Sequence, residues 1–189
     1  MKLISKITFI SLILGLIFIW AKLSFAEDWY QWRGPNRDGI SQEKGWSTKW
    51  ADGGPTVLWK ISVGIGYSSV SVSKNRIYTV GNIDKTDTVY CLDANNGSVI
   101  WKYSYPCVAD GGGYPGPAST PIIDGNSVYI LSREGHLFCL NADTGKVIWS
   151  RHIVDDFGAQ YPEWGFACSP QVFGDKLILA VSLNLALNK

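Results

Sequence analysis

Residues that could support catalysis are few in this sequence and lie far apart. Among 189 residues there are two histidines, His136 and His152, and four cysteines. Neither histidine stands in an identifiable triad context with a serine or cysteine, so the spacing does not support general-base chemistry. The sequence also contains no Cys-x-x-Cys pair and no Cys/His spacing of a zinc site. It therefore predicts no catalytic residue and no metal site.

Two pairs of acids and one glycine-rich run are the remaining candidates for ligand binding. Asp84 and Asp87 fall in one turn, and Asp155 and Asp156 follow the second of two repeated units. Carboxylate pairs can coordinate calcium, but solvated loop acids show the same pattern. The run 111–116 lacks the lysine and the following helix of a phosphate-binding loop. We therefore expect solvated acids and a flexible connection between units.

Composition and charge restrict the class of protein. Hydrophobic residues make up 46% of the chain and charged residues 17%, with a formal net charge of +1. These values are typical of a globular chain that can pack a core. Lysines and arginines are scattered singly, so no basic patch is available for a phosphate backbone. The sequence therefore argues against nucleic acid as a partner.

The amino terminus has the pattern of a secretory signal peptide. Lys2 and Lys6 precede an apolar run at 7–21, and small residues lead up to Ala26. The run has 15 residues, fewer than the ~20 that span a bilayer, although an uncleaved membrane anchor is the alternative. We predict a signal peptide over 1–26, no integral membrane segment after its cleavage, and a periplasmic or extracellular protein.

Export would place the four cysteines in an oxidising compartment, which favours disulfides. Cys91 and Cys139 occupy the same position in two copies of one unit, and a whole repeat spacing is too long for a bridge. We expect both to be small buried hydrophobic residues. The sequence leaves open whether Cys107 pairs with Cys168.

An internal repeat is the main signal in the chain. The segments 88–101 and 136–149 align without a gap, and each ends in tryptophan. Upstream, similar segments begin at Ser69, Thr120 and Ser169, at offsets of 51 and 49 residues. A period of roughly 40–50 residues is in the range of β-propeller blades.

Each unit has the pattern of four short antiparallel strands. In the second unit, strands rich in Val, Ile, Tyr, Phe and Leu are expected at 118–123, 127–131, 136–141 and 146–151. No stretch after the signal peptide has a sustained helical period, so we expect almost no helix. Strands that are apolar on both faces indicate sheets packed between other sheets. The tryptophan that ends a unit would then bury ~200 Å² against the neighbouring blade, on the order of 5 kcal/mol at most.

The repeated segments resemble a known motif. The stretches 91–101 and 139–149 are similar to the tryptophan-docking motif of pyrroloquinoline-quinone (PQQ)-type β-propellers, in which a small residue, an acid, Thr-Gly and a terminal Trp recur. The stretch 29–39 resembles the leader of exported bacterial PQQ-like repeat proteins. Departures are modest, since Asn96 replaces the threonine and Asn141 the acid. The resemblance implies five structural docking residues, which are Trp59, Gly97, Trp101, Gly145 and Trp149.

The resulting fold prediction is an all-β, incomplete propeller of about two and a half blades plus one closing strand. Its parts are a leader at 27–55 and a partial propeller at 56–189, with a closing strand at 56–62, blades at 67–104 and 117–152, and a partial blade at 165–183. Such propellers close with roughly six to eight blades. We therefore expect a truncated or interrupted propeller, with ring closure by several short chains as the alternative.

The resemblance implies two functions. One is a non-catalytic scaffold of the cell envelope that binds proteins or small ligands, with envelope proteins as partners and no cofactor. The alternative is a fragment of a PQQ-dependent alcohol or sugar dehydrogenase, with PQQ and calcium as cofactors. Such dehydrogenases look like longer chains with a vicinal cysteine pair. This sequence contains no Cys-Cys pair and no acid that can be matched to the catalytic or calcium roles, so we favour the scaffold and assign neither cofactor-binding residues nor an oligomeric state.

Several aromatic residues lie in the leader and the loops. They are Tyr30, Trp32, Trp46, Trp50 and Trp164. A binding surface is one interpretation of such exposed aromatic residues. Packing of the leader against the ring is the interpretation we expect.

Overall fold

The computed structural model describes residues 27–108 and 114–182. The predicted signal peptide at 1–26, part of the glycine-rich run and the end of the predicted partial blade lie outside the described residues. No helix within the described ranges is long and apolar enough to cross a membrane.

The first repeat forms a four-stranded antiparallel sheet in the order β1-β2-β3-β4. Its strands are β1 (Ser71–Ser73), β2 (Arg76–Ile83), β3 (Thr86–Asp93) and β4 (Val99–Pro106). Two-residue turns connect the first three strands. Both residues of each turn, Lys74 with Asn75 and Asp84 with Lys85, have positive φ angles, as the tightest hairpin turns require.

The second repeat forms an equivalent sheet in the order β5-β6-β7-β8. Its strands are β5 (Ile122–Asp124), β6 (Ser127–Leu131), β7 (His136–Asn141) and β8 (Val147–His152). Tyr78, Cys91 and Trp101 lie opposite one another across the first sheet, and Tyr129, Cys139 and Trp149 do so across the second. A bulge follows the cysteine in both sheets. The predicted all-β propeller blades are therefore confirmed.

The remaining elements are short. Strands β9 (Gln171–Phe173) and β10 (Lys176–Ile178) form a two-stranded sheet within the predicted partial blade. One helical turn, α2 (Ile153–Phe157), ends at Gly158, whose φ of 67° is left-handed. Residues 56–62 form no strand ladder within the described part of the chain, so the closing strand stays a prediction. The described sheets do not close into a ring.

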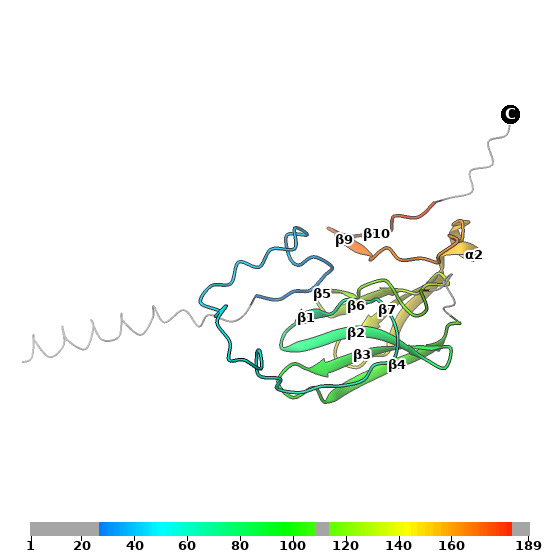
Figure 1. Cartoon of the computed structure of the whole chain (residues 1–189). Helices are drawn as coiled ribbons and strands as arrows, with labels where there is room; N and C mark the ends of the chain where they lie inside the picture. Colours follow the sequence, from blue (N-terminus) through cyan, green and yellow to red (C-terminus); the bar gives the residue numbers. More distant parts are fainter. Residues whose placement is uncertain (1–26, 109–113, 183–189) are drawn as a thin grey trace, which may run out of the picture.

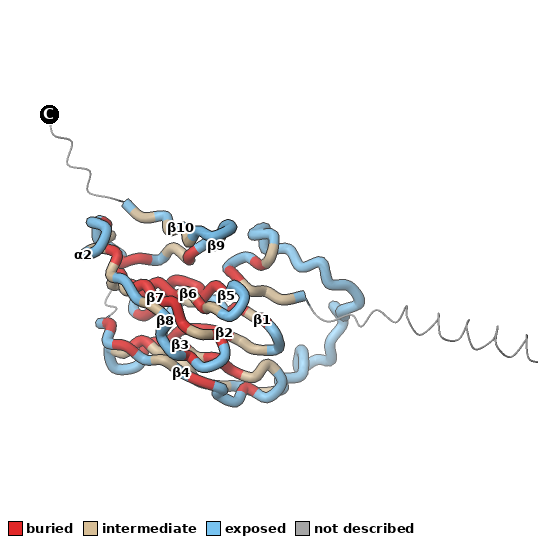
Figure 2. The backbone as a smooth tube through the Cα atoms, turned by 180° about the vertical axis from the view of Figure 1, so that it is seen from behind, coloured by how far each residue is buried: buried red, intermediate tan, exposed pale blue. Residues whose placement is uncertain are grey.

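The core lies between the two four-stranded sheets, which stack face to face (Figure 1). Figure 2 shows the buried residues concentrated along this interface. From the first sheet the core takes Tyr78, Val89, Cys91 and Trp101, and from the second Val128, Phe138 and Leu140, among others. A smaller core lies between the second sheet and the chain leading to β9 and β10.

All four cysteines are free thiols in the structure. Cys91 and Cys139 are buried, as predicted, and desolvation raises the pKa of both thiols. Cys107 is buried and Cys168 half-buried, and no bridge joins them. The cysteines therefore act as packing residues in this fold.

Candidate functional site

The contact between the two sheets is built around Trp101 at the end of the first repeat. Its indole N–H donates to the Ala142 carbonyl oxygen at 2.8 Å, and the ring lies against Gly145. A Cβ atom at Gly145 would lie 2.6 Å from Trp101 Cε3, and the φ of 68° at this glycine is left-handed. Only glycine therefore meets both requirements of this position.

Trp59 makes the same contact one repeat earlier. Its indole N–H donates to the Ala94 carbonyl oxygen at 3.0 Å, and its ring lies against Gly97, which also has a positive φ. Trp59 belongs to a segment that pairs with no strand among the described residues, yet its indole occupies the position equivalent to that of Trp101. Each turn of the form Ala-x-x-Gly thus receives a tryptophan from the preceding segment.

Trp149, the third tryptophan of the series, has a different environment. Its indole N–H has no hydrogen-bond acceptor among the residues that the structure describes. The side chain is half-buried and borders an open cavity of ≈ 440 Å³. This cavity is lined by Leu137, Trp149, Arg151, Phe157, Leu177 and Leu179. The open face of the second sheet is therefore apolar and only partly covered.

A second repeated link runs between the first strands of successive units. The Ser69 backbone N–H donates to Thr120 Oγ1 at 3.3 Å, and the Thr120 N–H donates to Ser169 Oγ at 3.0 Å. These are the three positions at which the sequence repeats begin. The hydroxyls of Thr120 and Ser169 thus each join their unit to the preceding one, a role that the spacing alone did not indicate.

The leader crosses these first strands and contacts all three sheets. The Val72 N–H donates to the Trp29 carbonyl oxygen and the Ile123 N–H to that of Tyr30, both at 2.9 Å. Arg37 Nη2 donates to the Val172 carbonyl oxygen at 3.0 Å. The expectation that the leader packs against the sheets therefore holds for its first part.

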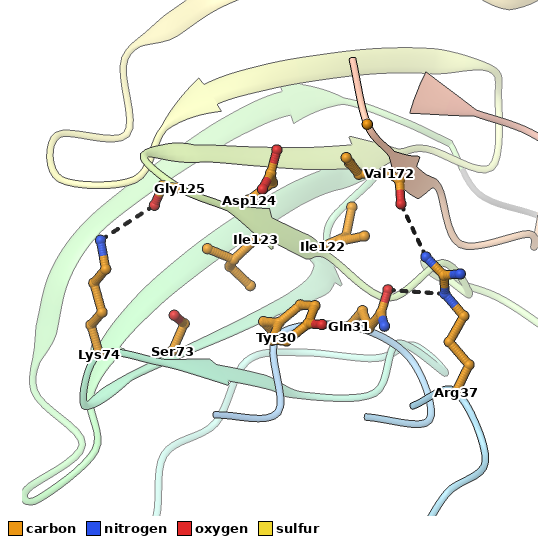
Figure 3. Close-up of a pocket in the computed structure, with 11 residues that line it drawn as sticks. Tyr30, Gln31, Arg37, Ser73, Lys74, Ile122, Ile123, Asp124, Gly125 and Val172 are labelled. Carbon is orange, nitrogen blue, oxygen red and sulfur yellow. Dashed lines mark hydrogen bonds between the residues drawn. The ribbon is translucent and has the colours of Figure 1, made fainter. Parts of the chain in front are cut away.

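A pocket of ≈ 430 Å³ lies where the leader meets the first strands (Figure 3). Tyr30, Ile122 and Ile123 form its apolar centre, with Arg37 toward one end and Lys74 toward the other. The remaining lining residues are Gln31, Ser73, Asp124, Gly125, Val172 and Gly174. An apolar centre flanked by hydrogen-bonding and charged groups suits ligand binding.

The cations of this pocket are held in place by carbonyl and amide oxygens. Arg37 Nε donates to Gln31 Oε1 at 3.3 Å, and Lys74 Nζ lies 3.5 Å from the Gly125 carbonyl oxygen. The Ser73 hydroxyl donates to the Asp28 carboxylate at 2.8 Å. The pocket therefore places a hydroxyl bonded to a carboxylate and two cations around an apolar centre, which are groups suited to binding.

The aromatic residues of the leader that follow Tyr30 do not pack against the sheets as the sequence predicts. Trp32, Trp46 and Trp50 are 53%, 70% and 60% exposed, so the later part of the leader does not pack as expected. Trp32 borders a smaller pocket with Arg33, and Trp164 is exposed outside the leader, where its carbonyl oxygen accepts from Arg133 Nη1. The aromatic leader is therefore available for contacts with other molecules.

One residue of the two acid pairs differs from expectation, whereas Asp84, Asp155 and Asp156 are exposed as expected. Asp84 is exposed, but the prediction that Asp87 is solvated is wrong, because Asp87 lies within β3 and is fully buried. Asn82 Nδ2 donates to its Oδ1 at 2.7 Å and the Tyr105 hydroxyl to its Oδ2 at 3.2 Å. Burial raises the pKa of Asp87 above its ordinary value. Its role in the structure is to satisfy two buried donors.

The two histidines, which sequence spacing separates, are brought together. His136 on β7 lies opposite His152 at the end of β8. Asp155 and Asp156 belong to α2, where Asp155 Oδ2 lies 2.9 Å from His152 Nδ1 and the Asp156 carboxylate accepts the His152 N–H. Aligning the strands of the repeat could have found this pairing, because hairpin register places these residues side by side.

Comparison with known proteins identifies the family. The sequence matches the model of a PQQ-type repeat family described as outer membrane protein assembly factor BamB, over residues 41–153 and 111–182. These matches span most of the chain. The chain belongs to this family of PQQ-like β-propeller proteins. No curated protein sequence matches it significantly.

Solved structures show the same fold. BamB from Moraxella catarrhalis superposes with a TM-score of 0.50 at 18% identity, covering 66% of this chain and 37% of that one. Quinohemoprotein alcohol dehydrogenases from Comamonas testosteroni and Pseudomonas putida HK5 each give 0.52, at 21% and 23% identity. They cover 66% and 67% of this chain and 18% and 19% of theirs. The PQQ-like chain thus spans well under half the length of these neighbours.

Proposed function

We propose that this PQQ-like chain is a non-catalytic binding scaffold of the cell envelope. The observation that carries the proposal is the leader, which adds a pocket and exposed tryptophans to the first strands of three successive units. Rigid aromatic side chains beside a pocket are typical anchors of protein interfaces. The family description, outer membrane protein assembly factor, supports an envelope partner and an exported chain.

The predicted docking residues have a structural role in this proposal. Trp59 with Gly97 and Trp101 with Gly145 link successive units at the turns before β4 and β8, and Trp149 would receive a further Ala-x-x-Gly turn in the same way. The contacts of Trp59 and Trp101 with glycine and a carbonyl oxygen support this role. A scaffold built this way presents the leader from a rigid base.

Site-specific photo-crosslinking in cells tests the binding role. A photoreactive phenylalanine analogue replaces Trp32 in one variant and Trp164, which is 51% exposed and lies outside the leader, in the control. We expect a discrete crosslinked envelope protein from position 32 and none from position 164. Equal crosslinking at both positions, or none at either, contradicts a binding face at the leader.

The alternative is a fragment of a quinone-dependent dehydrogenase. Structural similarity to the two alcohol dehydrogenases favours this alternative. At identities of 21% and 23%, however, the similarity shows a shared fold and not a shared activity. The test is incubation of the purified chain with PQQ and calcium, followed by dye reduction with alcohols or sugars. Reduction of the dye that depends on PQQ would support the dehydrogenase and contradict the scaffold proposal.

A further inference from the structure

The two histidines form a cross-strand pair on the second sheet. They are the only histidines of the sequence, and they lie opposite each other in the β7–β8 register. Their ring centres are 4.7 Å apart, with 77° between the ring planes. Both side chains are half-buried, so the rings remain open to solvent.

The repeat itself does not require this pair. Thr88 and Ser104 occupy the same register position in the first sheet, where their hydroxyl groups share a hydrogen bond of 2.9 Å. The strand pairing of the blade therefore forms equally with two hydroxyl side chains at this position. The fold of the blade therefore does not explain why the second sheet has two imidazoles at this position.

Each imidazole has a side-chain oxygen close to Nδ1, although the Asp155 carboxylate does not reach hydrogen-bond geometry with the buried His152 Nδ1. His152 Nδ1 lies 2.9 Å from Asp155 Oδ2, and His136 Nδ1 lies 3.3 Å from Ser132 Oγ. A carboxylate can only accept, so Asp155 favours the His152 tautomer with the proton on Nδ1 and leaves the Nε2 lone pair of that ring free. The Ser132 hydroxyl, which also accepts the His136 backbone N–H, can donate to His136 Nδ1 or accept from it. Histidines that bind metals are commonly oriented in this way by a carboxylate or another oxygen.

The ring separation fits two ligands of one ion. For a metal–nitrogen distance of about 2.1 Å and N–metal–N angles of about 90–109°, the ring centres lie about 4.6–5.3 Å apart. The observed 4.7 Å falls in this interval. From this geometry we propose that His136 and His152 bind a divalent transition-metal ion such as Zn²⁺ through their Nε2 atoms, with water completing the coordination.

The surrounding charges favour this assignment. Burial, and then the neighbouring His152, lower the pKa of His136, which keeps the imidazole in the neutral form that binds metals. The carboxylates of Glu134, Asp155 and Asp87 act on the same ring electrostatically and favour a cation there. The described residues contain no group of three or more His, Cys, Asp or Glu ligands, so the site is a two-histidine site of modest affinity and is independent of the proposed scaffold function.

Zinc titration followed by NMR of the histidine ring protons tests the site. The background variant is Cys168→Ser, because this half-buried thiol is the cysteine among the described residues that is not fully buried. We expect both imidazoles to shift together and to saturate at one Zn²⁺ per chain. A shift of one ring alone, or of neither, overturns the proposal even if further variants fail to fold.

Substitutions supply the matched comparison by calorimetry. His136→Gln and His152→Gln should each weaken Zn²⁺ binding at least tenfold, whereas the double variant Thr88→His/Ser104→His, at the equivalent register of the first sheet, should add a second site. Unchanged affinity in either glutamine variant overturns the proposal. Circular dichroism identifies variants that do not fold. If a variant does not fold, the NMR titration of the Cys168→Ser chain with Zn²⁺ decides whether the proposal holds.

Discussion

The two faces of the second sheet differ in how far the tryptophan that ends a repeat is buried. On one face, the Ala142-x-x-Gly145 turn receives Trp101, whose side chain is 8% exposed and whose indole N–H is hydrogen-bonded. On the other face, the equivalent Trp149 is half-buried beside an open cavity. The residue and its strand position are the same, so the difference comes from the partner. Burial of the tryptophan thus belongs to the junction between units and not to the single blade.

Loss of the filled junction should have the largest effect. Trp101→Ala removes a buried indole and one of the donors to the Ala142 carbonyl oxygen, which keeps its contact with Arg76 Nη1. The loss of the packed ring should lower the free energy of unfolding by about 3–5 kcal/mol. Urea denaturation monitored by circular dichroism measures the loss. A loss no greater than that of a surface substitution would show that the sheets are held together elsewhere.

Overfilling the same junction should cost slightly less. Gly145→Val places a Cβ against the Trp101 ring and forces a β-branched residue into a positive φ, at a cost of about 2–4 kcal/mol. Gly125→Val is the matched control, because Gly125 also has a positive φ but no atoms within 4 Å of its added Cβ. Thermal unfolding should separate the variants, and equal destabilisation would attribute the effect to backbone strain alone.

The open face should respond weakly. Trp149→Ala removes a half-buried side chain that has no indole hydrogen bond among the described residues, so we expect a loss of about 1–2 kcal/mol. Chemical denaturation of this variant beside Trp101→Ala gives the contrast directly. Equal losses would mean that the two faces are equivalent in solution.

The smallest effect is a pH dependence from the first sheet. The pKa of Asp87 is raised above 3.8 by burial, so the folded state takes up a proton more readily than the unfolded chain. Its contribution to stability is therefore greatest at low pH and is lost as pH rises through the folded-state pKa. Asp87→Asn should cost more stability at about pH 4 than at about pH 7 in urea unfolding. A cost that grows with pH would contradict a raised pKa.

The sequence predicted the blades because their signals are local. The four-strand pattern, the turns and the buried Cys91 and Cys139 all follow from alternation and repeat alignment. The extra helix α2 is a single turn, too short for a helical period to show in the sequence. Asp87 was misjudged because a charged residue near a turn is usually solvated, and its donors Asn82 and Tyr105 come from neighbouring strands.

The pocket and the histidine pair could not be predicted in the same way. The pocket combines leader residue Arg37 with β9, 135 residues later in the chain, and no local pattern reports such a contact. The pairing of His136 with His152 depends on hairpin register, which the repeat alignment contained but residue spacing alone did not reveal. Features set by local sequence patterns could therefore be predicted, whereas features that depend on contacts between distant residues could not.

Hydrogen exchange of the tryptophan indole N–H groups tests the central claim most directly. The indoles of Trp101 and Trp59 donate to carbonyl oxygens of the following unit, whereas that of Trp149 does not within the described chain. We predict slow exchange for Trp101, intermediate exchange for the half-buried Trp59, and fast exchange for Trp149 in one ¹⁵N-resolved NMR experiment. Exchange of Trp101 as fast as that of Trp149 would contradict the claim that this contact joins the repeats.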